Sequence, residues 1–182
     1  MNRLIHDLGQ LLSAPESETA RIQRVADRVG AFVQEPPSLN PRFTRPGHDT
    51  YARYLVHRDS QHRFVVVAMV WGPGQRTPVH DHGTWGIIGM LQGHIAAWTY
   101  QRQDDGAQEG YAELEESGYI EAGPGTVLPV VFPPDDEIHR LQNPGDQVAI
   151  GLHIYGKDIE RCRSFDLTTN QWTWRELHYT DA

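Results

Sequence analysis

The sequence has little of what several large classes of protein require. It contains one cysteine, Cys162, in 182 residues, which excludes an internal disulfide framework and any multi-cysteine zinc or iron–sulfur site. A reducing cytoplasmic location is therefore expected. No apolar run approaches the ~20 residues that a transmembrane helix needs, and the first residues lack the unbroken hydrophobic region of a secretory signal. We expect a soluble protein that is not exported.

Basic charge is also scarce. Lys and Arg total 16 against 24 Asp and Glu, which gives a formal net charge of −8. An excess of acid repels phosphate backbones and anionic lipid, and no local basic cluster reverses it. We expect neither nucleic acid nor a membrane surface as a partner, and the oligomeric state is left open.

Histidine, by contrast, is abundant. The chain has ten histidines, and imidazole is the commonest neutral metal ligand where thiolates are absent. The length fits a single domain over residues 1–182. Within it, 38% hydrophobic residues together with 17 glycines and 12 prolines indicate a closed core with many turns.

Residues 1–35 are predicted to form two helices. Apolar residues recur at helical spacing over 4–12 and again over 22–33, and Pro15 separates the two patterns. Ser17 is suited to cap the second helix because a hydroxyl oxygen can accept a hydrogen bond from a free backbone N–H.

From Tyr51 onward the pattern changes to that of an all-β sandwich or barrel. Short β-branched and aromatic runs alternate with Gly, Pro and Asp clusters at regular spacing. The predicted strands are 51–57, 63–71, 78–82, 85–91, 94–101, 111–114, 118–121, 126–132, 137–141, 147–155 and 162–167. The tail, residues 168–177, is expected either to form one more strand or to pack back over the barrel.

The segment most suggestive of chemistry contains His80 and His82. Residues two apart on a strand face the same side, so both imidazoles can converge on one point inside a barrel. Gly74 and Pro78 shape the turn into this strand. The alternative is a pair of half-buried structural histidines bonded to backbone carbonyls.

A catalytic metal needs a third ligand, since two imidazoles rarely suffice. His139 is the candidate. It follows a predicted turn at residues 133–136, and Asn143 lies four residues beyond it.

These two motifs resemble those of the cupins: Gly, five residues, His-x-His, and later His, three residues, Asn. The resemblance covers residues 50–157 and implies an all-β fold, a jelly-roll-like small β-barrel, with 1–35 as an N-terminal helical segment and 158–182 as C-terminal strands packing on the barrel. No acid lies between His82 and His94, where most cupins supply a glutamate, and Asp136 replaces a glycine of the second motif. A site of three neutral histidines favours an anionic ligand such as a thiolate.

The stretch 51–93 is similar, almost end to end, to the thiol dioxygenases of the cysteine dioxygenase type I family, including WGPGQ before the ligand strand and WG after it. This resemblance implies that His80, His82 and His139 bind Fe(2+). It also implies that Arg53 holds the carboxylate of the substrate, a task suited to the planar guanidinium fork. The alternative for Arg53 is a solvated arginine on a strand.

The family's Ser-x-His-x-Tyr array corresponds to Gly151, His153 and Tyr155. The resemblance implies that His153 holds the Tyr155 phenol toward dioxygen or sulfur, but the serine that would support His153 is missing. Mammalian members carry a cysteine that is crosslinked to the tyrosine. Ile87 stands in its place here, so no crosslink is expected.

The function implied is an iron-dependent thiol dioxygenase that converts a small thiol carboxylate and O2 to the sulfinate. Arg53 points to L-cysteine as the substrate. The absent crosslink and the segment 71–82 instead resemble bacterial 3-mercaptopropionate dioxygenases, so 3-mercaptopropionate or mercaptosuccinate is the alternative. Arg161 and Arg163, just past Tyr155, offer an alternative carboxylate anchor. Trp71, Trp85 and Tyr155 are expected to wall the pocket.

Two other classes stay open at this point. A three-histidine cupin can hold zinc, nickel or manganese and act as an isomerase or hydrolase, because imidazole suits several metals. A metal-free binding domain with structural histidines is the other alternative.

Overall fold

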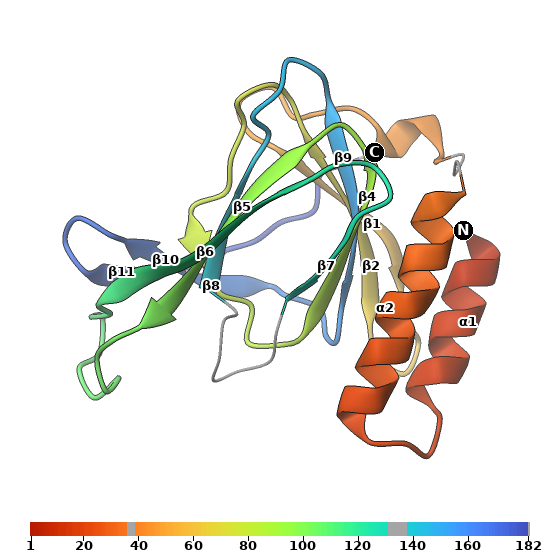
Figure 1. Cartoon of the computed structure of the whole chain (residues 1–182), viewed down its shortest axis with the longest axis horizontal. Helices are drawn as coiled ribbons and strands as arrows, with labels where there is room; N and C mark the ends of the chain where they lie inside the picture. Colours follow the sequence, from red (N-terminus) through yellow and green to blue (C-terminus); the bar gives the residue numbers. More distant parts are fainter. Residues whose placement is uncertain (36–38, 131–137, 182) are drawn as a thin grey trace.

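The computed structural model describes residues 1–35, 39–130 and 138–181 of the chain (Figure 1). Two helices, α1 (Asn2–Leu12) and α2 (Glu18–Gln34), come first, as the sequence predicted. The Ser17 hydroxyl accepts a hydrogen bond from the backbone N–H of Ala20 and so caps α2. A short 3-10 turn, η1 (Pro41–Phe43), leads to the strands.

The strands form two antiparallel sheets. The five-stranded sheet has the order β1-β2-β9-β4-β7 and the six-stranded sheet the order β11-β10-β3-β8-β5-β6. The strand bounds are β1 (Ala52–Arg58), β2 (Val65–Trp71), β3 (Val79–His80), β4 (Gly86–Gln92), β5 (Ile95–Arg102), β6 (Leu114–Ala122), β7 (Val127–Val130), β8 (Ile138–Gln142), β9 (Ala149–Tyr155), β10 (Arg161–Asp166) and β11 (Gln171–Glu176). The tail thus forms a strand, the first of its two predicted alternatives. The predicted turn at 133–136 lies outside the described residues.

Two predicted strand boundaries are wrong, each for a local reason. Of the strand expected at 111–114 only Leu114 belongs to a strand, and β6 runs from there through the predicted break to Ala122. Its pairing with β5 slips by one residue, so a bulge takes the place of that break. The strand expected over 78–82 is only Val79–His80. Pro78 has no N–H to donate to a ladder, and the carboxylate of Asp81 takes over the hydrogen bonding beyond His80.

The helical hairpin packs on the outer face of the five-stranded sheet (Figure 1). Helix α2 comes close to β4 at Gly89, where a Cβ atom would lie 2.7 Å from the side chains of both Val29 and Val33. Glycine is therefore required for this close approach. The side chains buried between helices and sheet include Leu4, Leu8, Val25, Val29, Phe64, Val66, Ile87, Leu152 and Ile154.

The opposite face of the same sheet looks into the barrel. Because side chains alternate along a strand, β2 and β9 are covered by helices or loops on one face and by the second sheet on the other, and every residue in both is buried. On β9 the alternation sends Leu152 and Ile154 toward the helices. It leaves His153 and Tyr155 on the barrel side, where Tyr155 packs with the inner core.

Candidate metal centre

His80 and His139 lie directly opposite each other. They are partner residues of β3 and β8 in the six-stranded sheet, and their rings are 4.8 Å apart between centroids. The ring of His82 is 4.7 Å from each of the other two. One ligand nitrogen from each of the three residues can be chosen so that all lie within 4.8 Å of one another. The structure therefore brings together the three imidazoles that the sequence singled out.

His82 is placed by its neighbour Asp81, since β3 ends before it. One oxygen of the Asp81 carboxylate accepts a 2.8 Å hydrogen bond from the backbone N–H of Arg163 on β10. The other pairs with the Arg163 guanidinium, and the N–H of Asp81 donates to the Arg163 carbonyl at 3.3 Å. These contacts attach the segment between His80 and His82 to β10 and fix its path.

The donor set suits a metal ion. Nδ1 of His80 lies 3.0 Å from the carbonyl of Pro78, and a carbonyl only accepts, so Nδ1 carries the hydrogen and Nε2 is left to bind. Nε2 of His139 is buried and has no hydrogen-bond partner among the described residues. An unpaired buried nitrogen is costly in a protein interior unless something binds it.

The charge state of the three imidazoles also fits. Burial, the main cause, lowers the pKa of His80 to about 4. Burial followed by the neighbouring imidazoles lowers the pKa of His82 and of His139 well below the usual range. All three are neutral at physiological pH, which is the form that coordinates metal.

Tyr155 and His153 adjoin this cluster from the opposite sheet. The Tyr155 ring stacks on His82 with 5.2 Å between centroids, and its hydroxyl lies 2.8 Å from Nδ1 of His153. Burial raises the pKa of the Tyr155 phenol and lowers the pKa of His153 to about 3. Both groups are therefore neutral near pH 7, and the imidazole tautomer sets the direction of their hydrogen bond.

Nε2 of His153 is buried and has no hydrogen-bond partner among the described residues. Gly151 lies beside it, since a Cβ atom at that position would be 3.1 Å from Nε2. The missing serine thus leaves an unsatisfied nitrogen. On another side His153 packs against Trp71, with 5.6 Å between ring centroids. Trp71 therefore lies behind His153 and is not among the residues that line the inner cavity described next.

A narrow inner cavity opens beside the three histidines. Its lining includes His80, His82, Tyr155, Arg53, Tyr51, Met69, Pro78, Ile159, Cys162, Arg175 and Leu177. Arg53 reaches it from β1 and is only 8% exposed. Its guanidinium donates long, 3.5 Å hydrogen bonds to the carbonyls of His178 and Ile159. Sequence reasoning missed Arg175, which enters from β11.

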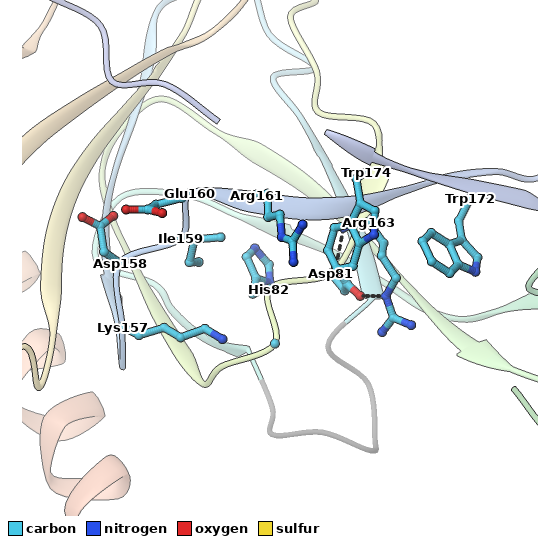
Figure 2. A pocket seen from close by; sticks show the side chains of 11 residues that line it. Asp81, His82, Lys157, Asp158, Ile159, Glu160, Arg161, Arg163, Trp172 and Trp174 are labelled. Atoms are coloured by element: carbon cyan, nitrogen blue, oxygen red, sulfur yellow. Dashed lines mark hydrogen bonds and ion pairs between the residues drawn. The ribbon is translucent and has the colours of Figure 1, made fainter. Parts of the chain in front are cut away.

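An outer pocket of about 430 Å³ shares His82 and Ile159 with the inner cavity (Figure 2). Arg161 and Arg163 lie here, and neither lines the inner cavity. Figure 2 shows Arg163 joined to Asp81 and Arg161 beside Trp174. Of the two arginines expected as an alternative carboxylate anchor, Arg163 is thus held in an internal ion pair and Arg161 lies over the Trp174 ring.

Two antiparallel sheets that enclose a buried cluster of three histidines define the class: this is a cupin with a metal-binding site. Among the described residues, no helix combines the length and the apolar character needed to cross a bilayer.

Comparison with known proteins identifies the family. The family model for cysteine dioxygenase type I matches residues 3–168. Cysteine dioxygenase type 1 of Danio rerio is 24% identical over 175 residues, covering 91% of this chain and 79% of that protein. The Rattus norvegicus protein of the same name is 24% identical over 176 residues, with 91% and 78% covered. This chain belongs to the cysteine dioxygenase type I family, and its enzyme class is thiol dioxygenase.

Solved structures were also compared. A protein from Thermus thermophilus is 19% identical with a TM-score of 0.48, covering 67% of this chain and 97% of that one. A cupin superfamily protein from Desulfitobacterium hafniense is 17% identical with a TM-score of 0.47, covering 69% and 94%.

Proposed function

We propose that this protein is an iron-dependent dioxygenase that converts a small thiol carboxylate to its sulfinate. The observation that carries the proposal is the cluster of three neutral imidazoles beside a narrow cavity. Two of them, His80 and His82, line that cavity together with Arg53 and Tyr155. His80, His82 and His139 would hold the metal. When bound, ferrous iron would supply open coordination positions and the redox capacity that joins a thiolate to dioxygen.

The overall reaction is R–SH + O2 → R–SO2⁻ + H⁺. The S–H and O–O bonds break and two S–O bonds form, so that sulfur loses four electrons and dioxygen gains them. The role of the protein is to hold the thiol in one orientation in a narrow cavity, because positioning alone contributes substantially to the rate.

Arg53 would bind the substrate carboxylate. Its guanidinium is buried, and its two hydrogen bonds to carbonyl groups are at the 3.5 Å limit, so donor capacity remains for an incoming anion. Charge-assisted bonds from a guanidinium to a carboxylate are shorter and stronger than such contacts. The carboxylate end of the thiol would therefore be directed toward β1 and its sulfur toward the histidines.

Tyr155 would donate a hydrogen bond into the cavity from its hydroxyl. Its raised pKa keeps the phenol protonated, and His153 fixes the direction of the hydroxyl through their 2.8 Å contact. The phenol can therefore stabilise negative charge on sulfur or oxygen without itself becoming charged.

The test is to measure metal content, oxygen consumption and sulfinate yield on the same purified protein. We expect mainly iron, one sulfinate formed per O2 consumed, and loss of both metal and turnover in His80→Ala, His82→Ala and His139→Ala, with the fold checked by circular dichroism. Tightly held zinc or nickel without oxygen uptake would overturn the proposal in favour of an isomerase or hydrolase. Failure to retain any metal after anaerobic iron loading would indicate a binding domain. A cytoplasmic location stays a prediction from the single cysteine.

A further inference from the structure

The charged side chains that line the inner cavity are all positive among the described residues. Two arginines, Arg53 from β1 and Arg175 from β11, are among the residues that line it. No Asp or Glu is among the lining residues in the described part of the chain. A ligand in this cavity therefore meets two guanidinium groups and no carboxylate from these residues.

Arg175 faces the cavity as a result of strand pairing. It is the register partner of Cys162 on β10, and Cys162 lines the same cavity. Burial raises the pKa of the Tyr51 phenol, and the nearby charges of Arg175 and Arg53 both oppose that rise. Both guanidinium groups therefore act on one side of the cavity.

Arg175 also lacks a polar partner among the described residues. Among the described residues, its guanidinium has no hydrogen bond or ion pair, in contrast to Arg163 with Asp81 and Arg58 with Asp158. Arg175 lies beyond residue 168, where the match to the family model ends.

Two aspartates near the site, Asp81 and Asp158, are already paired. Asp81 is held by Arg163, and Asp158 accepts hydrogen bonds from Arg58 and from the Tyr179 hydroxyl. Neither lines the inner cavity. An ammonium group on a bound thiol would therefore lie near two guanidinium groups with no anionic side chain of the lining to pair with it.

We propose that Arg175 is a second carboxylate-binding residue and that, together with Arg53, it selects mercapto acids without an amino group, such as 3-mercaptopropionate, over L-cysteine. This inference rests on the proposed function, because it assumes that the ligand of the inner cavity is the thiol substrate. Arg53 is buried and Arg175 is exposed, and like charges brought together in a binding site repel and so help to discriminate between partners.

The first experiment compares kcat/KM for 3-mercaptopropionate and L-cysteine in the purified iron enzyme. We expect the wild type to prefer 3-mercaptopropionate at least tenfold. Arg175→Glu should lower that preference by about ten- to a hundredfold, because it removes one guanidinium and supplies a partner for the ammonium group. Arg175→Lys keeps the charge and should keep most of the preference. Arg161→Glu makes the same charge change on β10 in the outer pocket and should leave the ratio within about twofold.

A second measurement needs no turnover. Propionate and β-alanine differ only by an amino group and carry no thiol, so their effect on the thermal midpoint of the protein reports binding alone. Propionate should raise the midpoint of the wild type more than β-alanine does, and Arg175→Glu should remove this difference.

The possible outcomes separate the two proposals. If the wild type oxidises no thiol, the proposed function fails, and the propionate and β-alanine comparison still decides whether the cavity selects against an amino group. The role of Arg175 is wrong, while the dioxygenase proposal stands, if the wild type oxidises L-cysteine and 3-mercaptopropionate with equal kcat/KM. The same conclusion follows if Arg175→Glu changes neither the ratio of the two kcat/KM values nor the thermal midpoints with propionate and β-alanine.

Discussion

The carboxylate of Asp81 binds both the backbone N–H and the guanidinium of Arg163. Asp81 lies between two of the three clustered histidines, and β3 ends before it, so the contacts with Arg163 attach the segment between His80 and His82 to β10. Asp81 is 4% exposed, so the pair is shielded from water on the carboxylate side and should contribute more than a surface ion pair does.

The first prediction follows from this contact. Asp81→Asn keeps the size of the side chain but loses the charge, and we expect it to weaken iron retention about tenfold, as loss of a residue that orients metal ligands commonly does. Arg163→Met should act in the same direction. The measurement is the iron remaining per chain after equilibration with a graded chelator. Asp166→Asn is the control, because Asp166 only supports the turn after β10. Equal iron retention in all three variants would show that Asp81 does not position His82.

The second prediction concerns Tyr155. Tyr155→Phe keeps the ring that stacks on His82 and removes only the hydroxyl, so we expect an intact fold and full iron with a lower kcat. We also expect less sulfinate per O2 consumed, since an oriented hydrogen-bond donor has been lost. Tyr119→Phe, at an exposed residue on β6, should change neither. An unchanged rate with one sulfinate per O2 would assign Tyr155 to packing.

The third prediction tests the carboxylate role of Arg53. Loss of a buried charge-assisted hydrogen bond costs about 1.5–3 kcal/mol, or about ten- to a hundredfold in kcat/KM. Arg53→Ala should therefore impair the oxidation of 3-mercaptopropionate and L-cysteine and spare cysteamine, which has no carboxylate. The measurement is oxygen uptake with the three thiols side by side. An equal loss for all three would make Arg53 a structural residue of the barrel wall.

The fourth prediction addresses the unsatisfied nitrogen of His153. Gly151→Ser and Gly151→Ala bring the same crowded Cβ atom, 3.1 Å from Nε2, but only serine adds a hydroxyl that can pair with it. We expect the serine variant to be more stable than the alanine variant by about 1–3 kcal/mol, the usual cost of a buried polar group without a partner. Urea unfolding gives the difference. Equal stabilities would mean that Nε2 is already satisfied.

The fifth prediction concerns the attachment of the helices. Asp59 accepts hydrogen bonds from the Arg63 guanidinium, and the same guanidinium donates to the Gly9 carbonyl at the end of α1. The Arg63 side chain, followed in the opposite sense by burial, lowers the pKa of Asp59 to about 2. Because the folded pKa lies below the unfolded value, the ionised carboxylate stabilises the folded state above pH ~4, and this contribution is lost as the pH falls toward 2.

Asp59→Asn should therefore lower the stability most at neutral pH, and its difference from wild type should shrink as the pH falls from about 4 toward 2. Urea unfolding of both proteins at several pH values measures this difference. Asp27→Asn, in a mainly solvent-facing position of α2, is the control. A difference that does not depend on pH would show that the carboxylate charge contributes nothing.

Much of the site could be predicted because its signals are local. The two-residue spacing of His80 and His82, and a third histidine ahead of Asn143, are visible in the sequence. The structure shows why the motif residues accompany them. The Asn143 amide donates to the carbonyls of Trp71 and Gly72, and so joins the loops that lead into β3 and out of β8.

Other assignments could not be made from the chain alone. Arg161, Arg163 and Arg175 all belong to the pair β10 and β11, and nothing in the sequence distinguishes them. Only the register of these strands places Arg175 in the inner cavity and turns Arg161 and Arg163 to the outer pocket. Trp71 is the last residue of β2, a strand buried on both faces, so the hydrophobic pattern did not reveal that it lies behind His153.

By itself, the sequence determined the class of fold, the two helices and the three histidines, because helical periodicity, strand alternation and turn chemistry act between residues close in the chain. The tertiary structure decided which charged side chains form ion pairs within the protein and which can bind a ligand. Arg163 forms an ion pair with Asp81 and is therefore not available to bind an anion, whereas Arg175 lines the cavity. Such pairing depends on strands that meet only after the barrel closes, and hence on long-range contacts that no local pattern encodes.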